Sequence, residues 1–271
     1  MRKVMVFVAL AVLMLAALVA CDAGTNSNTS EVQITDVNSV APTAESFAKN
    51  FYARRPTQYT WPPVSKSVVQ NAPDVLTKNY YLVIDGSGSM EDTGCSGNQQ
   101  KIDVAKVAVN QFVSAIPDDA NVGLLVFDAY GIGERVGLGM NQNAVKQRVQ
   151  AITASGGTPL KSAMTAAYEA LSLQAQKQFG YGEYHLIVVT DGEAGTDQDP
   201  GALVATMLRE SPVIVHTIGF CIGSGHSLNV PGVTNYRAAN NPEELLAGLQ
   251  NVLAESNEYG VDNFDTAKDS Q

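Results

Sequence analysis

The sequence predicts an α/β protein with a doubly wound, mostly parallel, six-stranded sheet, helices on both faces and one antiparallel edge strand. Two observations lead to this fold. Short unbroken apolar runs alternate with amphipathic stretches through residues 79–254, as is typical of parallel strands joined by helical crossovers. Loops rich in glycine and in oxygen-bearing side chains recur where one edge of such a sheet is expected.

The strands are predicted from short runs of β-branched, aromatic and leucine residues, which suit strands buried on both faces. Such runs occupy residues 80–84, 122–127, 186–190 and 213–220, and a shorter strand is expected over 236–239. Residues 135–139 alternate instead, with Val136 and Leu138 on one side. This alternation predicts a half-buried edge strand.

The helices are predicted from apolar residues that recur at helical spacing between those strands. They cover residues 102–116, 145–152, 160–171, 202–209 and 242–253. Pro117 stops the first helix, and Pro159 and Pro242 stand where two later helices begin, because the missing N–H of proline is harmless there. Strand and helix therefore alternate almost throughout the domain.

The amino terminus has the features of a secretory signal. Arg2 and Lys3 precede an unbroken apolar run over residues 4–20, which is followed by Cys21. The ending Leu-Val-Ala-Cys resembles the bacterial lipobox, and this implies a lipidated Cys21 that anchors the mature protein to a membrane. The alternative is an uncleaved anchor helix. Both interpretations place the remainder of the chain outside the cytoplasm.

The chain has 271 residues, of which 45% are hydrophobic and 16% charged, a balance that suits one sizeable domain with appendages. The predicted parts are a signal peptide (1–20), a flexible tether (21–46), an amino-terminal arm (47–78), the α/β domain (79–254) and an acidic tail (255–271). Asp22 resembles the signal that retains enteric lipoproteins in the inner membrane. We therefore expect a lipid-anchored protein of the bacterial envelope that faces the periplasm or the exterior.

The charge balance argues against nucleic acid as a partner. The formal net charge is −10, and loss of a leader that carries Arg2 and Lys3 would bring it to −12. An acidic surface repels the phosphate backbone and anionic lipid headgroups alike.

The most informative loop is Asp85-Gly86-Ser87-Gly88-Ser89, directly after the first strand. Oxygen-bearing side chains stand at alternate positions, and the glycines between them permit the backbone to turn. Oxygen ligands suit a hard cation such as Mg²⁺ or Ca²⁺. The serines could instead cap the next helix. A phosphate-binding loop, a serine-hydrolase elbow and an EF-hand each fail on spacing.

Two further loops favour the cation. Thr158 and Asp191 are expected at the same sheet edge as the first loop. Asp85, Ser87 and Ser89, followed by Thr158 and then Asp191, resemble the metal-ion-dependent adhesion site of the von Willebrand factor A domain. The resemblance covers about residues 79–254, and all five positions match.

The resemblance implies a role for each of the five residues. Ser87 and Ser89 would bind the metal directly, Thr158 directly or through water, and Asp85 and Asp191 through water. Such mostly neutral ligands would leave the cation's charge under-compensated, so that a Glu or Asp of a protein partner could complete the octahedron. Mg²⁺ is the expected ion, with Mn²⁺ or Ca²⁺ as alternatives.

Two cysteines remain once Cys21 is set aside. Cys95 and Cys221 lie in an oxidising compartment, where a pair suggests a disulfide before it suggests zinc. His185, His216 and His226 show no zinc-ligand spacing with them, and each is expected to be a core or surface residue. Since the resemblance places both cysteines near the metal edge, we expect a disulfide that braces its rim.

These expectations describe a membrane-tethered, divalent-metal-dependent protein-binding module for adhesion or complex assembly, not an enzyme. The segments 91–100, 128–134, 197–200 and 221–231 would select its partner. One alternative is a structural envelope lipoprotein whose cation only stiffens the fold. The other is a metal-assisted hydrolase, for which Glu193 is the only nearby candidate base.

Overall fold

The computed structural model describes residues 61–64, 69–195 and 197–257, which all belong to one unit of the chain, residues 42–271. The predicted signal peptide, Cys21 and the tether lie outside these residues. Within the described ranges, no helix combines the length and the apolar character needed to cross a membrane.

The core of the molecule is the predicted six-stranded sheet. Its strands are β1 (Asn79–Asp85), β2 (Asn121–Asp128), β3 (Gly131–Gly139), β4 (Tyr184–Thr190), β5 (Ile214–Phe220) and β6 (Asn235–Ala239). They lie in the order β3-β2-β1-β4-β5-β6. Only the pair of β2 and the edge strand β3 is antiparallel. The predicted fold class is therefore confirmed.

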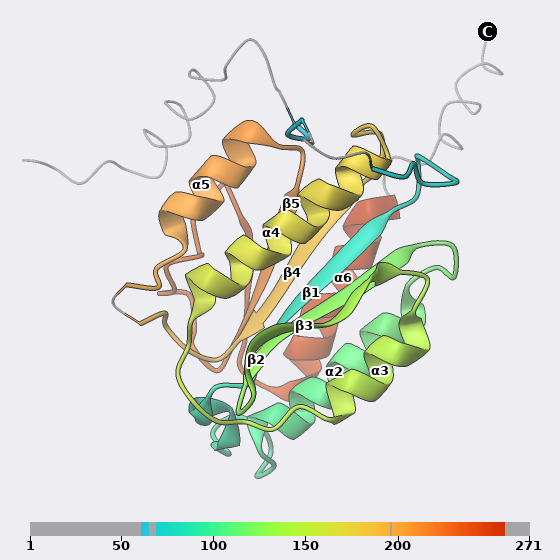
Figure 1. Cartoon of the computed structure of the whole chain (residues 1–271). Helices are drawn as coiled ribbons and strands as arrows, with labels where there is room; N and C mark the ends of the chain where they lie inside the picture. The colour runs from blue at the N-terminus through green and yellow to red at the C-terminus, as the bar shows by residue number, and fades with distance from the viewer. Residues whose placement is uncertain (1–60, 65–68, 196, 258–271) are drawn as a thin grey trace, which may run out of the picture. The chain divides into compact units, whose positions relative to one another are not determined.

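Helices cover both faces of this sheet. They are the short 3-10 helix η1 (Gly88–Glu91) and the α-helices α2 (Lys101–Ala115), α3 (Gln142–Gln150), α4 (Leu160–Lys177), α5 (Gly201–Glu210) and α6 (Pro242–Asn257). Figure 1 shows α4 and α5 on one face and α2, α3 and α6 on the other. The central strand β1 is consequently buried at every position, as its unbroken apolar run predicts.

The two faces share β1 by alternation. Tyr80, Leu82 and Ile84 pack in the hydrophobic cluster under α2, α3 and α6. Tyr81 and Val83 pack in the cluster under α4 and α5. Successive side chains of a strand point to opposite faces, so a strand covered on both sides carries apolar side chains on both.

The expectation for Val136 and Leu138 is wrong. Val136 packs against the cluster under α2, α3 and α6, whereas Leu138 packs against the opposite cluster. The pairing of β2 with β3 shifts register around Leu124, and such a bulge changes the side to which following residues point. β3 also begins at Gly131, earlier than predicted. Its first residues are glycine-rich and mostly exposed, so no apolar pattern in the sequence marks the start of the strand.

The last helix is longer than predicted. The sequence placed its end at Leu253 and an acidic tail from Glu255 onward, but α6 continues to Asn257. Glu255 accepts a hydrogen bond from Arg237 at 3.0 Å and another from Asn235 at 3.1 Å. These contacts tie the last turns of α6 to β6, so Glu255 belongs to the packed helix.

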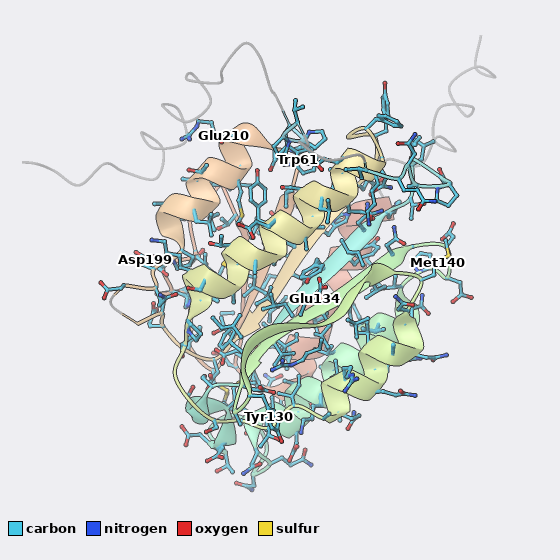
Figure 2. All side chains as sticks on the ribbon, viewed as in Figure 1. Trp61, Tyr130, Glu134, Met140, Asp199 and Glu210 are labelled. Atoms are coloured by element: carbon cyan, nitrogen blue, oxygen red, sulfur yellow. A yellow bond between two sulfur atoms is a disulfide. The ribbon has the colours of Figure 1, made fainter. Side chains whose placement is uncertain are left out.

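The described part of the amino-terminal arm packs at the amino ends of the strands. The Trp61 ring meets Tyr184 edge-on at 4.9 Å, and its Nε1 donates to the Ser172 hydroxyl of α4 at 3.2 Å. Figure 2 shows Trp61 at one end of the molecule and Tyr130 at the other. The described part of the arm therefore lies away from the loops near Tyr130.

Candidate metal centre

The carboxyl ends of β1 and β4 bring two site residues together. The strands are parallel neighbours, with Ile84 paired to Val189, so Asp85 and Thr190 end up side by side. The Thr190 hydroxyl donates to Asp85 Oδ2 at 2.6 Å. Both side chains are fully buried, so Asp85 is held rigidly behind the loops that follow.

The loop after β1 turns around Asp85. The Ser87 backbone N–H donates to Asp85 Oδ1 at 2.7 Å, and the Ser87 and Ser89 hydroxyls lie 3.1 Å apart. The 3-10 turn η1 contains Ser89, and its Met90 is buried in the core. The buried Met90 side chain thus anchors the turn to the core, and both serine hydroxyls lie in the loop at the carboxyl end of β1.

Asp191 joins the same cluster from β4. The Ser89 hydroxyl donates to Asp191 Oδ1 at 2.7 Å, and Asp191 is only 4% exposed. Hydrogen bonds therefore link the loop after β1 to the loop after β4.

Thr158 enters from the third loop, which backbone hydrogen bonds hold against the first. Ser155 N donates to Gly86 O at 2.8 Å, and Gly88 N donates to Gly156 O at 3.0 Å. A Cβ at Gly192 would lie 3.5 Å from Thr158 Oγ1 and 3.7 Å from Ser89 Oγ. Both hydroxyls thus border the same small space beside Gly192, and all five predicted site residues lie at one edge of the sheet.

The environment of Asp85 is electrostatically demanding. Burial raises the pKa of its carboxyl above the usual value. Hydrogen bonds from Ser87 and Thr190 oppose this shift, and the nearby charge of Asp191 adds to it. A buried carboxylate in such surroundings favours a compensating positive charge.

One such charge is Lys101, which the sequence analysis missed. Its Nζ lies 2.8 Å from Asp191 Oδ2 and 3.5 Å from the Ser89 carbonyl oxygen. Lys101 is the first residue of α2, where the helix dipole disfavours a cation. That unfavourable position was a signal in the sequence that the lysine has a partner elsewhere.

Two further supporting residues were also missed. His226 is buried, accepts the Leu228 N–H at Nδ1 (3.0 Å) and so donates from Nε2 to Gly192 O (3.1 Å). Thr190 bonds Asp85 and also contacts Gly192 through its hydroxyl. His226 and Thr190 therefore hold the turn that carries Asp191, and no spacing rule pointed to His226.

The predicted disulfide between Cys95 and Cys221 is confirmed, with the two Cα atoms 6.1 Å apart. Cys95 lies between η1 and α2, and Cys221 directly follows β5. The bond therefore connects the loop before Lys101 to the loop that contains His226, and it braces the rim from the side.

The donor set fits a hard divalent cation, because it consists of the hydroxyl oxygens of Ser87, Ser89 and Thr158 beside the carboxylates of Asp85 and Asp191. The described residues contain no cluster of three or more His, Cys, Asp or Glu side chains placed to hold a metal. The 3.1 Å between the Ser87 and Ser89 hydroxyls is close to the roughly 2.9 Å that separates adjacent ligands in a magnesium octahedron. Because Ser89 donates its proton to Asp191, its oxygen can act as an acceptor or as a metal ligand.

A pocket lies beside Thr158, between the β2–β3 turn and the start of α4. Its volume of about 520 Å³ lies in the range of small-ligand sites. Phe127, Ala129, Ile132 and Pro159 provide apolar lining, and the remaining lining residues are Asp128, Thr158, Gln198 and four glycines. The exposed Tyr130 stands near this edge in Figure 2.

Sequence comparison finds a family model that matches the central part of the chain. Residues 80–193 match the family model for the von Willebrand factor type A domain. The uncharacterized protein YwmD of Bacillus subtilis (strain 168) is 29% identical in an alignment of 162 residues, and the match covers 52% of this chain and 67% of that protein.

Solved structures share the fold at low identity. The pilus adhesin SpaC of Lactobacillus rhamnosus GG matches with a TM-score of 0.53 and 17% identity, over 69% of this chain but 31% of the adhesin. BatB of Bacteroides thetaiotaomicron matches with a TM-score of 0.53 and 16% identity, over 66% of this chain and 98% of the BatB chain. The von Willebrand factor domain of the type V pili tip protein Mfa5 from Porphyromonas gingivalis matches with a TM-score of 0.52 and 14% identity. The match covers 67% of this chain and 95% of the Mfa5 domain. These likenesses show the fold, and the family model that matches residues 80–193 is that of the von Willebrand factor type A domain.

Proposed function

We propose that this chain is a divalent-metal-dependent protein-binding module, tethered to the bacterial envelope through Cys21. Ser87, Ser89 and Thr158 would hold Mg²⁺, with Asp85 and Asp191 behind them. The observation that carries the proposal is the pair of hydroxyls, Ser87 and Ser89, which lie 3.1 Å apart at the loop edge. Mn²⁺ and Ca²⁺ are the alternative ions.

The roles of the residues follow from their contacts. Asp85 is buried and orients the Ser87 loop through its Oδ1, while Asp191 takes the proton of Ser89. The Ser89 hydroxyl is therefore oriented with its proton toward Asp191. A bound divalent cation would supply a positive coordination position for a carboxylate of the partner.

The pocket beside Thr158 adds a surface for the partner. Its apolar lining by Phe127, Ile132 and Pro159 suits a hydrophobic side chain next to the coordinating carboxylate. The partner would thus be a protein that presents Glu or Asp, with neighbouring apolar residues.

Two of the structural neighbours make adhesion a reasonable class of function. SpaC is a pilus adhesin and Mfa5 is a pilus tip protein. The present chain spans about a third of the adhesin's length, so we carry over only the general role of protein binding at a cell surface. Location in the envelope is part of the proposal.

The metal site is tested by calorimetric titration with Mg²⁺ and with Mn²⁺. We expect the wild-type protein to bind one ion, and Ser87→Ala to bind it at least about tenfold more weakly, since a direct ligand is lost. Ser114→Ala is the matched control, because Ser114 is exposed on α2, far from the proposed site, and its hydroxyl donates to Asn110 O and accepts from Lys146 Nζ at 3.5 Å. Equal affinity of wild type and Ser87→Ala would contradict the proposal.

Partner binding is tested by affinity capture from envelope extract. Wild type should retain a protein in Mg²⁺ and release it in chelator, while Ser87→Ala should retain none. The alternative is a structural lipoprotein whose cation only stiffens the fold. It would be favoured by a chelator that lowers thermal stability without releasing any protein.

An enzyme is not proposed. Glu193 was the candidate base for a metal-assisted hydrolase, and its side chain is exposed. Burial, and to a smaller extent the charge of Glu193, raises the pKa of Tyr236 to about 12. The Glu193 carboxylate therefore interacts with Tyr236 of β6. The absence of catalysis stays a prediction.

A further inference from the structure

Lys101 is the charged side chain that the proposed function leaves unexplained. Its ammonium lies 2.8 Å from Asp191 Oδ2, and the side chains of the two residues are 10% and 0% exposed. Asp191 therefore divides its oxygens, since Oδ1 accepts the Ser89 hydroxyl and Oδ2 accepts Lys101. Lys101 and the Ser89 hydroxyl therefore bond the two oxygens of the same carboxylate.

Helix formation does not account for this placement. Lys101 opens α2, where the positive end of the helix dipole repels a cation. The acidic residue of the same turn, Asp103, pairs with Lys106 at 3.4 Å. Lys101 is thus directed to Asp191 at a local electrostatic disadvantage, which points to a role in the centre.

The formal charges show what that role is. With both carboxylates ionised, Asp85, Asp191 and Lys101 carry a net charge of −1. A bound divalent cation would bring the loaded centre to +1, whereas the same centre without Lys101 would be neutral. A positive charge beside the site lowers affinity for a cation and raises the affinity of the loaded site for an anion.

We propose that Lys101 sets the charge of the centre, so that it binds the divalent ion more weakly but attracts a carboxylate more strongly once loaded. This inference rests on the proposed metal site. It identifies Lys101 as a residue that acts through Asp191 and determines the preference for an anionic partner.

The test compares Lys101→Gln with wild type in the full chain, with Mn²⁺ as the metal probe. Glutamine can still donate a hydrogen bond to Asp191 but carries no charge, which separates charge from orientation. Lys106→Gln removes the same charge from an outer pair of the same helix and is the matched control. Lys101→Arg keeps the charge, and circular dichroism checks the fold of each variant.

Lys101→Gln should bind Mn²⁺ about tenfold more tightly than wild type, whereas Lys106→Gln and Lys101→Arg should change little. Acetate at a fixed concentration should displace water from bound Mn²⁺, seen by proton relaxation, at least several-fold less effectively in Lys101→Gln. Should Lys101→Gln fail to fold, the Lys101→Met variant and the arginine variant provide the same comparison.

The outcomes separate this inference from the proposed function. Equal or weaker Mn²⁺ binding by Lys101→Gln, with binding by wild type intact, overturns the role of Lys101 and leaves the metal site standing. Binding by Lys101→Gln alone supports the role of Lys101. An absence of binding in both proteins overturns the inference together with the metal site.

Discussion

Asp85 is fully buried, although it is a carboxylate whose pKa burial raises above the usual value. A group whose charged form is disfavoured in the folded state reduces stability at neutral pH. Residues of this kind persist where function requires the charge. Asp85 therefore has the character of a site residue that weakens the fold.

Asp85→Asn should raise the thermal midpoint in chelator, by about 2–4 °C for each kcal/mol gained. The amide oxygen can keep the bond from Ser87 N–H, and Thr190 can donate to Gly192 O instead. The stabilising effect of Mg²⁺ should disappear in the same variant. Differential scanning calorimetry in chelator and in Mg²⁺ measures both effects, and a lower midpoint in chelator would contradict the argument.

Two buried histidines, His185 and His216, make stability depend on pH. His185 Nδ1 and His216 Nε2 lie 3.2 Å apart, between Glu183 on one side and Glu255 on the other. Burial lowers the pKa of His216 to about 3, assisted by His185, and burial likewise lowers the pKa of His185. Both rings are therefore neutral in the folded protein at pH 7.

The free energy of unfolding should fall as the pH drops below about 6.5, the ordinary histidine pKa. The unfolded chain binds these protons and the folded chain does not, so stability is full above that pH and is lost below it. Each histidine contributes a slope of up to about 1.4 kcal/mol per pH unit. Urea denaturation at several pH values should give a shallower slope for His216→Gln, and identical slopes would count against this account.

The loop after β1 fits tightly against the end of β2. A Cβ at Gly86 would lie 2.8 Å from Asp128 Cβ and 3.0 Å from both Ile152 Cγ2 and Phe127 O. Two of these atoms belong to side chains near their backbone, and one is backbone, so none can move freely. By contrast, Gly157 in the neighbouring loop has no atom within 4 Å of the equivalent position.

Gly86→Ala should destabilise the protein by about 1–3 kcal/mol, the usual effect of inserting a methyl group into packed space. It should also weaken Mn²⁺ binding, because the loop carries Ser87 and Ser89. Gly157→Ala is the control and should change the free energy of unfolding by less than about 0.5 kcal/mol. Denaturant unfolding of the two variants checks the contrast, and equal effects would refute it.

The disulfide acts between two loops that are 126 residues apart in the chain. Both half-cystines have positive φ, 49° for Cys95 and 67° for Cys221, a conformation that residues other than glycine adopt at some expense. The loops on either side carry Lys101 and His226. The covalent bond thus holds two strained turns next to the residues that support Asp191.

Replacement of both cysteines by serine should lower the free energy of unfolding by up to about 5 kcal/mol, from the loop-closure entropy of so long a segment. Mn²⁺ affinity should fall as well, because the supports of Asp191 become less ordered. Urea titration and calorimetry of the double variant measure these changes. A reduced wild-type protein should behave in the same way, and full stability of the double variant would contradict the prediction.

The sheet as a whole would couple binding of the proposed cation to folding. Residues 85–89, Thr158 and Asp191 come from three loops that meet only in the folded molecule. A cation that binds this arrangement and not the unfolded chain must stabilise the fold by mass action.

Mg²⁺ at one hundred times its dissociation constant should therefore add about 2.7 kcal/mol to the free energy of unfolding. Ser87→Ala should show little of this increase, while Ser114→Ala should show all of it. Thermal unfolding over a range of Mg²⁺ concentrations supplies the measurement. A midpoint that does not depend on Mg²⁺ would contradict the proposed site.

The regular elements were predictable because their signals are local. The unbroken apolar run of β1 reflects cover on both faces, and Pro117 follows directly after α2 and its capping residue Ile116. The orientation of Val136 and Leu138 was not predictable, since it depends on the register shift between β2 and β3. Nothing in residues 135–139 alone encodes that shift.

By itself, the sequence determined the α/β class and the three oxygen-bearing loops, because hydrophobic period and glycine placement are written in neighbouring residues. The tertiary structure alone decided that Lys101 meets Asp191 across 90 positions, that Thr190 meets Asp85 across 105 and that His226 meets Gly192 across 34. Such contacts depend on how strands and loops are placed in space, and a side chain that has no local partner does not reveal its distant one.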